Sequence, residues 1–242
     1  MSLAVLISIV IPFYNEEECF QDMLGPLVHA LESIDYELIL VDNGSRDATG
    51  DLIDKAIVAN HRLKKVRIEN NQGYGWGIIN GLKMSKGEYI GFMCGDGQIS
   101  AKDVVKTLLE LRDSSCDMVK VHRVKRKDGW VRIFTTRIFN AIVPFLFGLK
   151  SRDLNGTPKI FSRKVFGYVD LESKDWFIDV ELMIKSEFLG LDIREVPVAF
   201  EARKQGTSHV SILKAVLEFI KNVYRFKTGK HYRQWKKSKR LS

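Results

Sequence analysis

The segment Ser8-Ile-Val-Ile-Pro-Phe-Tyr-Asn-Glu16 joins a short apolar run to a polar loop. The run, Ala4–Pro12, has the length and the branched side chains of a buried β-strand. Four similar runs follow, with helical patterns between them: the runs are 37–42, 65–69, 88–94 and 117–122, and the helices lie near 16–33, 47–60, 75–85 and 102–112. This alternation predicts an α/β fold with a mainly parallel sheet and helices on both faces.

The alternation stops after residue 123. A helix is expected from about Val131, and a later strand, helix and strand end at Phe200. Residues 210–226 carry apolar side chains at helical i, i+3, i+4 spacing, which predicts an amphipathic helix that docks either on the protein's own core or on a membrane surface. We expect one domain over 1–209, followed by this helix and a basic tail over 210–242.

The positive charge of the chain is concentrated at its end. The formal net charge is +8, and the eight Lys and Arg residues from Arg225 onward have no Asp or Glu among them. The preceding residues therefore hold 30 basic and 30 acidic side chains. Such a tail suits an anionic membrane or nucleic acid, or is simply solvated. Because the sequence contains no nucleic-acid-reading module, we expect an anionic membrane surface and no nucleic acid as partner.

Three cysteines, Cys19, Cys94 and Cys116, have neither metal-ligand nor redox spacing. A small, odd number of cysteines favours a reducing compartment. The longest later apolar stretch, 138–149, is too short to span a bilayer. We therefore expect a cytoplasmic protein that is peripheral on the cytoplasmic face of a membrane.

Carboxylates and amides follow the predicted strands at the points where the strands end. Asp96 and Gln98 follow the fourth strand, and the other strand-end groups are Asn15, Glu16, Glu17, Asp42 and Asn43. Since the carboxyl ends of parallel strands meet at one sheet edge, these groups should converge there. Oxygen ligands of this kind suit Mg2+ or Mn2+ shared with substrate phosphates. The alternative is that Gly95-Asp96-Gly97 is a plain Asp-Gly turn.

Four segments in the right order resemble the nucleotide-binding motifs of family-2 glycosyltransferases: they are 8–16, 41–45, 71–75 and 95–98. Later segments, 152–159, 179–181 and 195–208, resemble the branch of that family that acts on polyprenyl phosphates, such as dolichol-phosphate mannosyltransferase. The resemblance covers the chain to about residue 210. It implies the GT-A fold, a Rossmann-like arrangement, and a hexosyltransferase activity.

The resemblance implies roles for the strand-end residues. Those expected to bind the nucleotide sugar are Pro12, Tyr14, Glu16, Asp42, Gly75, Gly95 and Asp96. The divalent cation would be held by Asp96 and Gln98. The family motif usually reads Asp-x-Asp-x-Gln, whereas this chain has Cys94-Gly95-Asp96-Gly97-Gln98. We expect the loss of one carboxylate to make the cation bind mainly together with nucleotide.

Further residues are implied for the phosphates and the acceptor. Those that match phosphate-holding positions are Arg123, Arg132, Thr136 and Arg203, which with Asp96 form the expected catalytic set. Those expected on the acceptor side are Asp179, Glu181 and Ser208. The spacing of Arg132 and Thr136 places both on one helix face, although arginines on an amphipathic helix are also typical of a solvated surface.

The resemblance implies an inverting transfer of a sugar from a UDP- or GDP-linked donor to a polyprenyl phosphate, either dolichyl or undecaprenyl, at a membrane surface. A lipid phosphate is already an anionic nucleophile, so it needs no strong base. Transfer to a saccharide is an alternative, and it would require Asp179 or Glu181 as base. A nucleotide-sugar-binding pseudoenzyme is a second alternative, suggested by Cys94. A homo-oligomer is possible for each of them.

Overall fold

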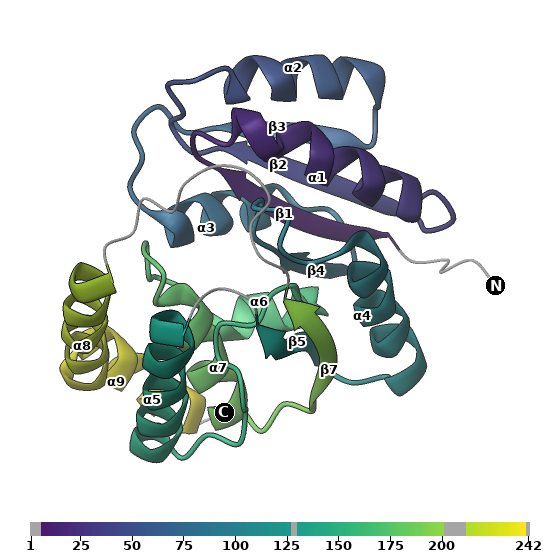
Figure 1. Cartoon of the computed structure of the whole chain (residues 1–242). Coiled ribbons are helices and arrows are strands. Elements are labelled where there is room, and N and C mark those ends of the chain that lie inside the picture. The colour runs from purple at the N-terminus through teal and green to yellow at the C-terminus, as the bar shows by residue number, and fades with distance from the viewer. Residues whose placement is uncertain (1–5, 127–129, 201–211, 241–242) are drawn as a thin grey trace.

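A computed structural model describes residues 6–126, 130–200 and 212–240. Its centre is a seven-stranded sheet with the strand order β3-β2-β1-β4-β6-β5-β7 (Figure 1). Neighbouring strands are parallel except in the two pairs that include β6, so β6 runs against the other described strands. The predicted α/β fold with a mainly parallel sheet is confirmed.

The first half of the chain repeats a strand followed by a helix. Its elements are β1 (Ile7–Phe13), α1 (Glu17–Ala30), β2 (Tyr36–Asp42), α2 (Thr49–Ala59), β3 (Leu63–Arg67), α3 (Tyr74–Met84), β4 (Tyr89–Phe92), α4 (Ala101–Ser114) and β5 (Met118–Arg126). Each lies within a few residues of its expected position. Because β2, β1 and β4 are neighbours in the sheet, the loops that follow them open at the same edge.

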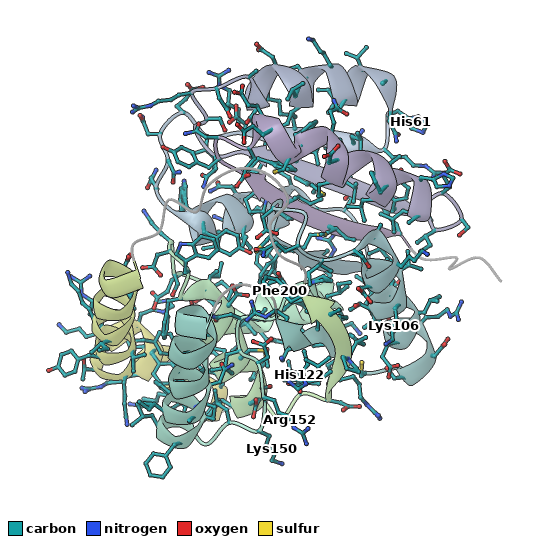
Figure 2. The ribbon with its side chains drawn as sticks, viewed as in Figure 1. His61, Lys106, His122, Lys150, Arg152 and Phe200 are labelled. Carbon is teal, nitrogen blue, oxygen red and sulfur yellow. The ribbon has the colours of Figure 1, made fainter. Side chains whose placement is uncertain are left out.

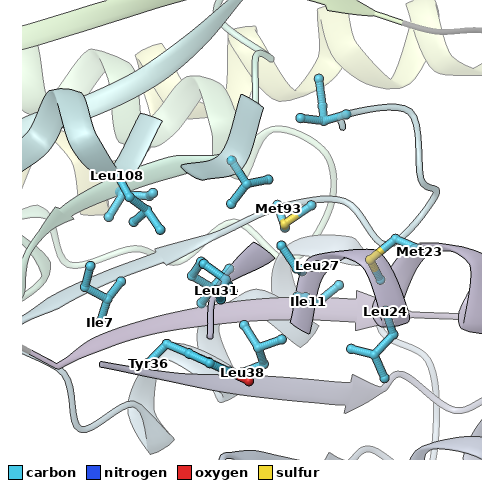
Figure 3. Packing of buried hydrophobic residues seen from close by; sticks show 14 of the residues in the cluster. Ile7, Ile11, Met23, Leu24, Leu27, Leu31, Tyr36, Leu38, Met93 and Leu108 are labelled. Atoms are coloured by element: carbon cyan, nitrogen blue, oxygen red, sulfur yellow. The ribbon is translucent and has the colours of Figure 1, made fainter. Parts of the chain in front are cut away.

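Alternate side chains of β1 divide the interior into two layers. Ile9 and Ile11 belong to the layer that includes Leu27 of α1 and residues of α2 and α4. Val10 belongs to the opposite layer, which includes Ile78 of α3 and residues of α6 and α7. Figure 3 shows part of the first layer, where side chains of α1 pack over β1 and β2. Helices therefore cover both faces of the sheet, as predicted.

The second half of the chain extends the sheet in a less regular way. Its elements are α5 (Trp130–Phe147), β6 (Lys159–Ser162), α6 (Arg163–Val169), α7 (Ile178–Phe188) and β7 (Ile193–Phe200). The short strand β6 inserts between β4 and β5 and is antiparallel to both. The chain thus returns into the middle of the sheet, where β6 joins β1–β4 to β5 and β7.

Two helices end the described chain. The predicted amphipathic helix is present as α8 (Ile212–Thr228), and the residues expected as a basic tail form a further helix, α9 (Lys230–Arg240). Tyr232 and Trp235 of α9 are 8% and 5% exposed, and they pack with Phe226 of α8. The indole Nε1 of Trp235 donates to the carbonyl oxygen of Tyr168 at 2.8 Å. The basic segment is therefore docked on the fold.

None of the helices in the described part of the chain combines the length and apolar character needed to cross a bilayer.

Replacement of Trp235 by Ala should lower the free energy of unfolding by about 3–5 kcal/mol, because it removes a large buried side chain and leaves a cavity. Urea denaturation followed by circular dichroism measures the change. Tyr224→Ala is the matched control, since Tyr224 of α8 is an aromatic residue that is 70% exposed. Equal stability of the two variants would show that α9 does not contribute to the folded core.

Candidate active site

The loops after β1 and β2 are fastened to each other by hydrogen bonds. Asn15 has a φ of 53°, in the left-handed region that Asn tolerates, and its N–H donates to Ser45 Oγ at 3.2 Å. Its side-chain Oδ1 accepts from the Arg46 N–H at 2.8 Å. The N–H of Glu16 donates to Thr49 Oγ1 at 2.9 Å. These bonds join the two loops into one ordered edge beside the strand ends.

The residues expected to bind the nucleoside lie at this edge. Asp42 is 4% exposed, and its Oδ1 accepts from the Ser45 N–H at 2.9 Å. Pro12 is buried at the end of β1, while the next residue but one, Tyr14, is 39% exposed. The carboxylate of Glu16 accepts from the Cys19 thiol at 3.1 Å. The fold thus brings these four side chains to adjacent strand ends, with the Asp42 carboxylate held in a fixed orientation.

The segment after β4 forms a tight turn. Asp96 Oδ1 accepts from the Gln98 N–H at 3.1 Å, and Gly97 between them has a φ of 68°. The plain Asp-Gly turn considered from the sequence is therefore present, and it orients the Asp96 carboxylate. Gly95 lies so close to the ring of Phe13 that a Cβ atom there would be 2.7 Å from the ring. This close approach ties the turn to the end of β1.

Cys94, which replaces the usual first aspartate, is part of a neutral cluster. Its Sγ lies 3.3 Å from the hydroxyl of Tyr74, and the hydroxyl of Thr157 donates to the same sulfur at 3.6 Å. Burial, followed by the negative charge of Asp96, raises the pKa of Cys94 to about 12. Burial also raises the pKa of Tyr74 well above its usual value. At neutral pH both groups are uncharged, so position 94 supplies no negative charge to a cation.

The donor atoms around 94–98 fit a cation that is shared with a ligand. Mg2+ commonly takes one or two carboxylates and completes an octahedral shell with water and phosphate oxygens. Asp96 supplies one carboxylate and the mostly buried Gln98 an amide. Within the described ranges, no group of three His, Cys, Asp or Glu side chains could hold a metal ion by itself. This donor set therefore suits a cation that arrives with a diphosphate.

The start of α3 is pressed against loop 170–177, which joins α6 to α7. A Cβ atom at Gly75 would overlap the carbonyl oxygens of Ser173 and Asp175. The N–H of Trp76 donates to the carbonyl oxygen of Lys174 at 2.9 Å. Gly75, expected at the nucleotide site, is therefore required by the close packing of two backbones, a constraint that the sequence does not reveal.

Arg123 near the end of β5 is held by Asp153. Its Nε and Nη2 donate to the two carboxylate oxygens at 2.7 Å each, and its backbone N–H donates to Oδ2 at 3.0 Å. Burial alone would raise the pKa of Asp153, but the hydrogen bonds and charge of Arg123 hold it well below its usual range. The guanidinium lies 5.0 Å over the ring of Phe200, which Figure 2 labels near the middle of the molecule.

Two fully buried lysines lie beside this pair. Lys120 of β5 binds Glu195 Oε1 of β7 at 3.0 Å and the carbonyl oxygen of Asp153 at 2.6 Å. Lys159 of β6 pairs with Asp179 at the start of α7. Burial lowers the pKa of Lys159 and raises that of Asp179, and the attraction between them partly offsets both effects. Asp179, expected on the acceptor side, is thus 3% exposed and engaged inside the protein.

Glu181, the second residue expected on the acceptor side, organises loop 170–177. Its carboxylate is fully buried and accepts from Lys185 Nζ at 2.5 Å and from the Ser173 N–H at 2.8 Å. It also accepts from the Glu172 N–H at 3.2 Å. The Glu181 carboxylate therefore holds the backbone of the loop in place.

The remaining predicted residues are described only in part. Arg132 and Thr136 belong to α5, and their side chains lie outside the described part of the structure. Arg203 and Ser208 lie outside the described residues. Sequence reasoning missed Tyr74 and the residues of the 152–159 segment that meet the site, which are Asp153, Thr157 and Lys159. The sequence marks that segment as similar to the family, but no pattern in it indicates which side chains point inward.

Comparisons with known proteins give a consistent family. The model of glycosyl transferase family 2 matches residues 8–169. Undecaprenyl-phosphate 4-deoxy-4-formamido-L-arabinose transferase of Edwardsiella ictaluri is 26% identical over 87% of this chain and 64% of its own length. Polyprenol monophosphomannose synthase of Mycolicibacterium smegmatis is 27% identical over 84% of this chain and 80% of its own length. The chain thus spans less than two thirds of the arabinose transferase.

Solved structures share the fold. Glucosyl-3-phosphoglycerate synthase from Mycobacterium tuberculosis, in complex with Mn2+ and UDP-glucose, has a TM-score of 0.71 at 20% identity over 93% of this chain and 80% of its own. Staphylococcus aureus TarS in complex with UDP-GlcNAc has a TM-score of 0.60 at 19% identity over 95% of this chain and 69% of its own. Both likenesses concern the arrangement of the sheet and its helices.

Replacement of Asp153 by Asn should lower the free energy of unfolding by about 3–5 kcal/mol, because it leaves the buried Arg123 without its charge partner. Urea denaturation at pH 7 measures the loss. Asp113→Asn is the control, since Asp113 pairs with Arg112 at the exposed end of α4 and its removal should leave the midpoint unchanged. A wild-type midpoint for Asp153→Asn would contradict the structural importance of the pair.

Proposed function

Because this chain belongs to glycosyl transferase family 2, we propose that it transfers a sugar from a nucleotide-sugar donor to a polyprenyl phosphate at a membrane surface, with inversion at the anomeric carbon. The matched relatives named for undecaprenyl phosphate and polyprenol support the acceptor class. The two solved structures that contain UDP-sugars support a UDP-linked donor.

The donor half of the proposal rests on the ordered sheet edge. Asp42 is oriented by the Ser45 N–H, so it can accept a hydrogen bond from a base, and Tyr14 and Glu16 stand beside it for the nucleoside. The 94–98 turn would receive the diphosphate. A divalent cation, Mg2+ or Mn2+, bound there by Asp96 and Gln98 would supply Lewis acidity to the leaving diphosphate.

The burial and ion pairing of Asp179 and Glu181 favour a phosphate over a saccharide as the acceptor. A saccharide hydroxyl needs a carboxylate that can take its proton. Asp179 and Glu181 are 3% and 0% exposed, and each is paired with a buried lysine. Neither is presented to an incoming hydroxyl. A phosphate acceptor is already negatively charged, so it requires cationic side chains for positioning and no base, and this is the acceptor that we propose.

The reaction is a single displacement. An oxygen of the acceptor phosphate forms a bond to the anomeric carbon while the bond from that carbon to the diphosphate oxygen breaks, and the nucleoside diphosphate leaves. The N–H groups of Arg123 that do not bind Asp153 would donate hydrogen bonds to the leaving diphosphate. We assign the acceptor phosphate to Arg132, Thr136 and Arg203, because cationic and hydroxyl side chains can hold a phosphate for attack.

The proposed membrane surface is formed by α5 and α8, which lie side by side (Figure 1). On α5, Ile142 and Phe145 are 51% and 88% exposed, and on α8 Ile220 and Tyr224 are 60% and 70% exposed. The opposite sides of both helices pack inward, through Val143, Phe147 and Phe226. Two adjacent helices with outward apolar side chains are typical of interfacial membrane binding.

Exposed cations lie on and near these helices. They are Lys221 and Arg225 of α8, and Lys150 and Arg152, both labelled in Figure 2, in the segment that follows α5. Basic side chains near an anionic headgroup layer each add useful binding energy. We propose that the protein is peripheral on the cytoplasmic face, where anionic lipids and nucleotide sugars are both accessible.

Replacement of Asp96 by Ala should weaken binding of the donor nucleotide roughly tenfold or more in the presence of Mn2+, because the cation loses its carboxylate. Calorimetric titration with UDP and with GDP, each with and without Mn2+, measures this. Asp113→Ala, a surface change on α4, is the control. Failure of the wild type to bind either nucleotide would contradict the proposal, and binding without transfer to any acceptor would favour a pseudoenzyme.

Replacement of Phe145 and Tyr224 by Ser together should reduce binding to anionic vesicles at least tenfold, because each aromatic contributes about 1.5–3 kcal/mol when its apolar surface leaves water. Co-sedimentation with phosphatidylglycerol-containing vesicles measures the bound fraction. Val58→Ser is the control, since Val58 is also 88% exposed but belongs to α2, a helix whose buried residue Ile53 packs in the opposite layer of the core. Equal binding of all three proteins would contradict this face.

A further inference from the structure

Trp176 is a large apolar side chain that the fold exposes and at the same time fixes. It lies in loop 170–177 and is 53% exposed. One face of its indole stacks on the ring of Tyr74, with the ring centroids 4.2 Å apart and the planes 15° from parallel. Because Tyr74 covers that face, the exposed area belongs to the other face and the edges of the indole.

The residues on both sides of Trp176 are anchored. The carboxylate of the preceding residue, Asp175, accepts from Asn222 Nδ2 of α8 at 2.7 Å and from the Phe177 N–H at 2.8 Å. One residue earlier, Lys174 accepts through its carbonyl oxygen from the Trp76 N–H at 2.9 Å. A side chain held this way has already lost conformational entropy, so a ligand that packs on it incurs little further ordering cost.

Trp176 is connected through its neighbours to the proposed donor site and to the proposed lipid-binding helix. Its stacking partner Tyr74 reaches Cys94 in the 94–98 turn at 3.3 Å, where the donor diphosphate would bind. Its neighbour Asp175 reaches Asn222 on α8, the helix that would contact lipid. Trp176 therefore stands between the turn and the lipid-facing helix. A lipid that enters along α8 and brings its phosphate beside the donor diphosphate would pass this side chain.

On the basis of the proposed function, we infer that Trp176 is a specificity-determining residue whose open face packs against the isoprenyl units next to the acceptor phosphate. A flat indole suits the flat, branched alkene of an isoprenyl unit, and burial of that unit would raise affinity in proportion to its apolar area. The contact would select lipid acceptors without contributing to the chemical step.

The test is steady-state transfer to farnesyl phosphate by wild type, Trp176→Ala and Trp176→Phe. We expect Trp176→Ala to raise the KM for farnesyl phosphate about tenfold, with kcat and the KM for the nucleotide sugar changed less than about twofold, and Trp176→Phe to restore part of the loss. Tyr168→Ala is the matched control, because Tyr168 of α6 is equally 53% exposed and lies away from the 94–98 turn.

The outcomes separate this inference from the proposed function. If the wild type transfers to farnesyl phosphate and Trp176→Ala has the same acceptor KM, the inference alone is overturned. An equal rise in the acceptor and donor KM values also overturns it, because Trp176 would then act only by supporting Tyr74. If the wild type binds the nucleotide sugar but transfers to no polyprenyl phosphate, the proposed acceptor and this inference both fail.

Discussion

Charge pairing inside the sheet is the constraint on which the second half of the molecule depends. Arg123, Lys120 and Lys159 come from β5 and β6, and each requires a carboxylate from a segment far away in the chain. A buried charge without a partner costs several kcal/mol, so these strands are stable only when the 152–159 segment, α7 and β7 are all in place. The ion pairs therefore fix the positions of these segments relative to one another. Burial of apolar side chains alone would allow other positions.

The same pairing connects the two halves of the candidate site. Asp153 holds Arg123 and begins the short segment that carries Thr157 to the sulfur of Cys94. The antiparallel strand β6 then places Lys159 opposite Phe92, the last residue of β4. Because β4 leads directly into the 94–98 turn, the position of the donor turn is fixed by the charged interior of the second half as well as by β1.

The regular part of the fold was predictable because its cause is local. Each strand and helix from 7 to 114 has its own apolar pattern, and the strand-end groups Asp42 and Asp96 converge once parallel strands are assumed. The insertion of β6 and the folding of 230–240 were not predictable in this way. Residues 230–240 carry a helical pattern of only Tyr232 and Trp235 among many cations, and their burial depends on Phe226 and α7. Likewise, no local pattern reveals that a side chain at position 75 would collide with the carbonyl oxygen of Ser173.

Loop 170–177 shows why the acceptor side is harder to infer from sequence than the donor side. The acidic residues that follow it at the start of α7, Asp179 and Glu181, resemble catalytic carboxylates in sequence, yet both are buried and paired with lysines inside the protein. Asp179 pairs with Lys159 of β6, and Glu181 holds a loop whose exposed apolar residue, Trp176, carries no charge and belongs to no recognisable motif. Since apolar contacts with a lipid need shape and exposure and no particular residue type, the side chains that recognise such a substrate become visible only when the fold shows which of them it leaves uncovered.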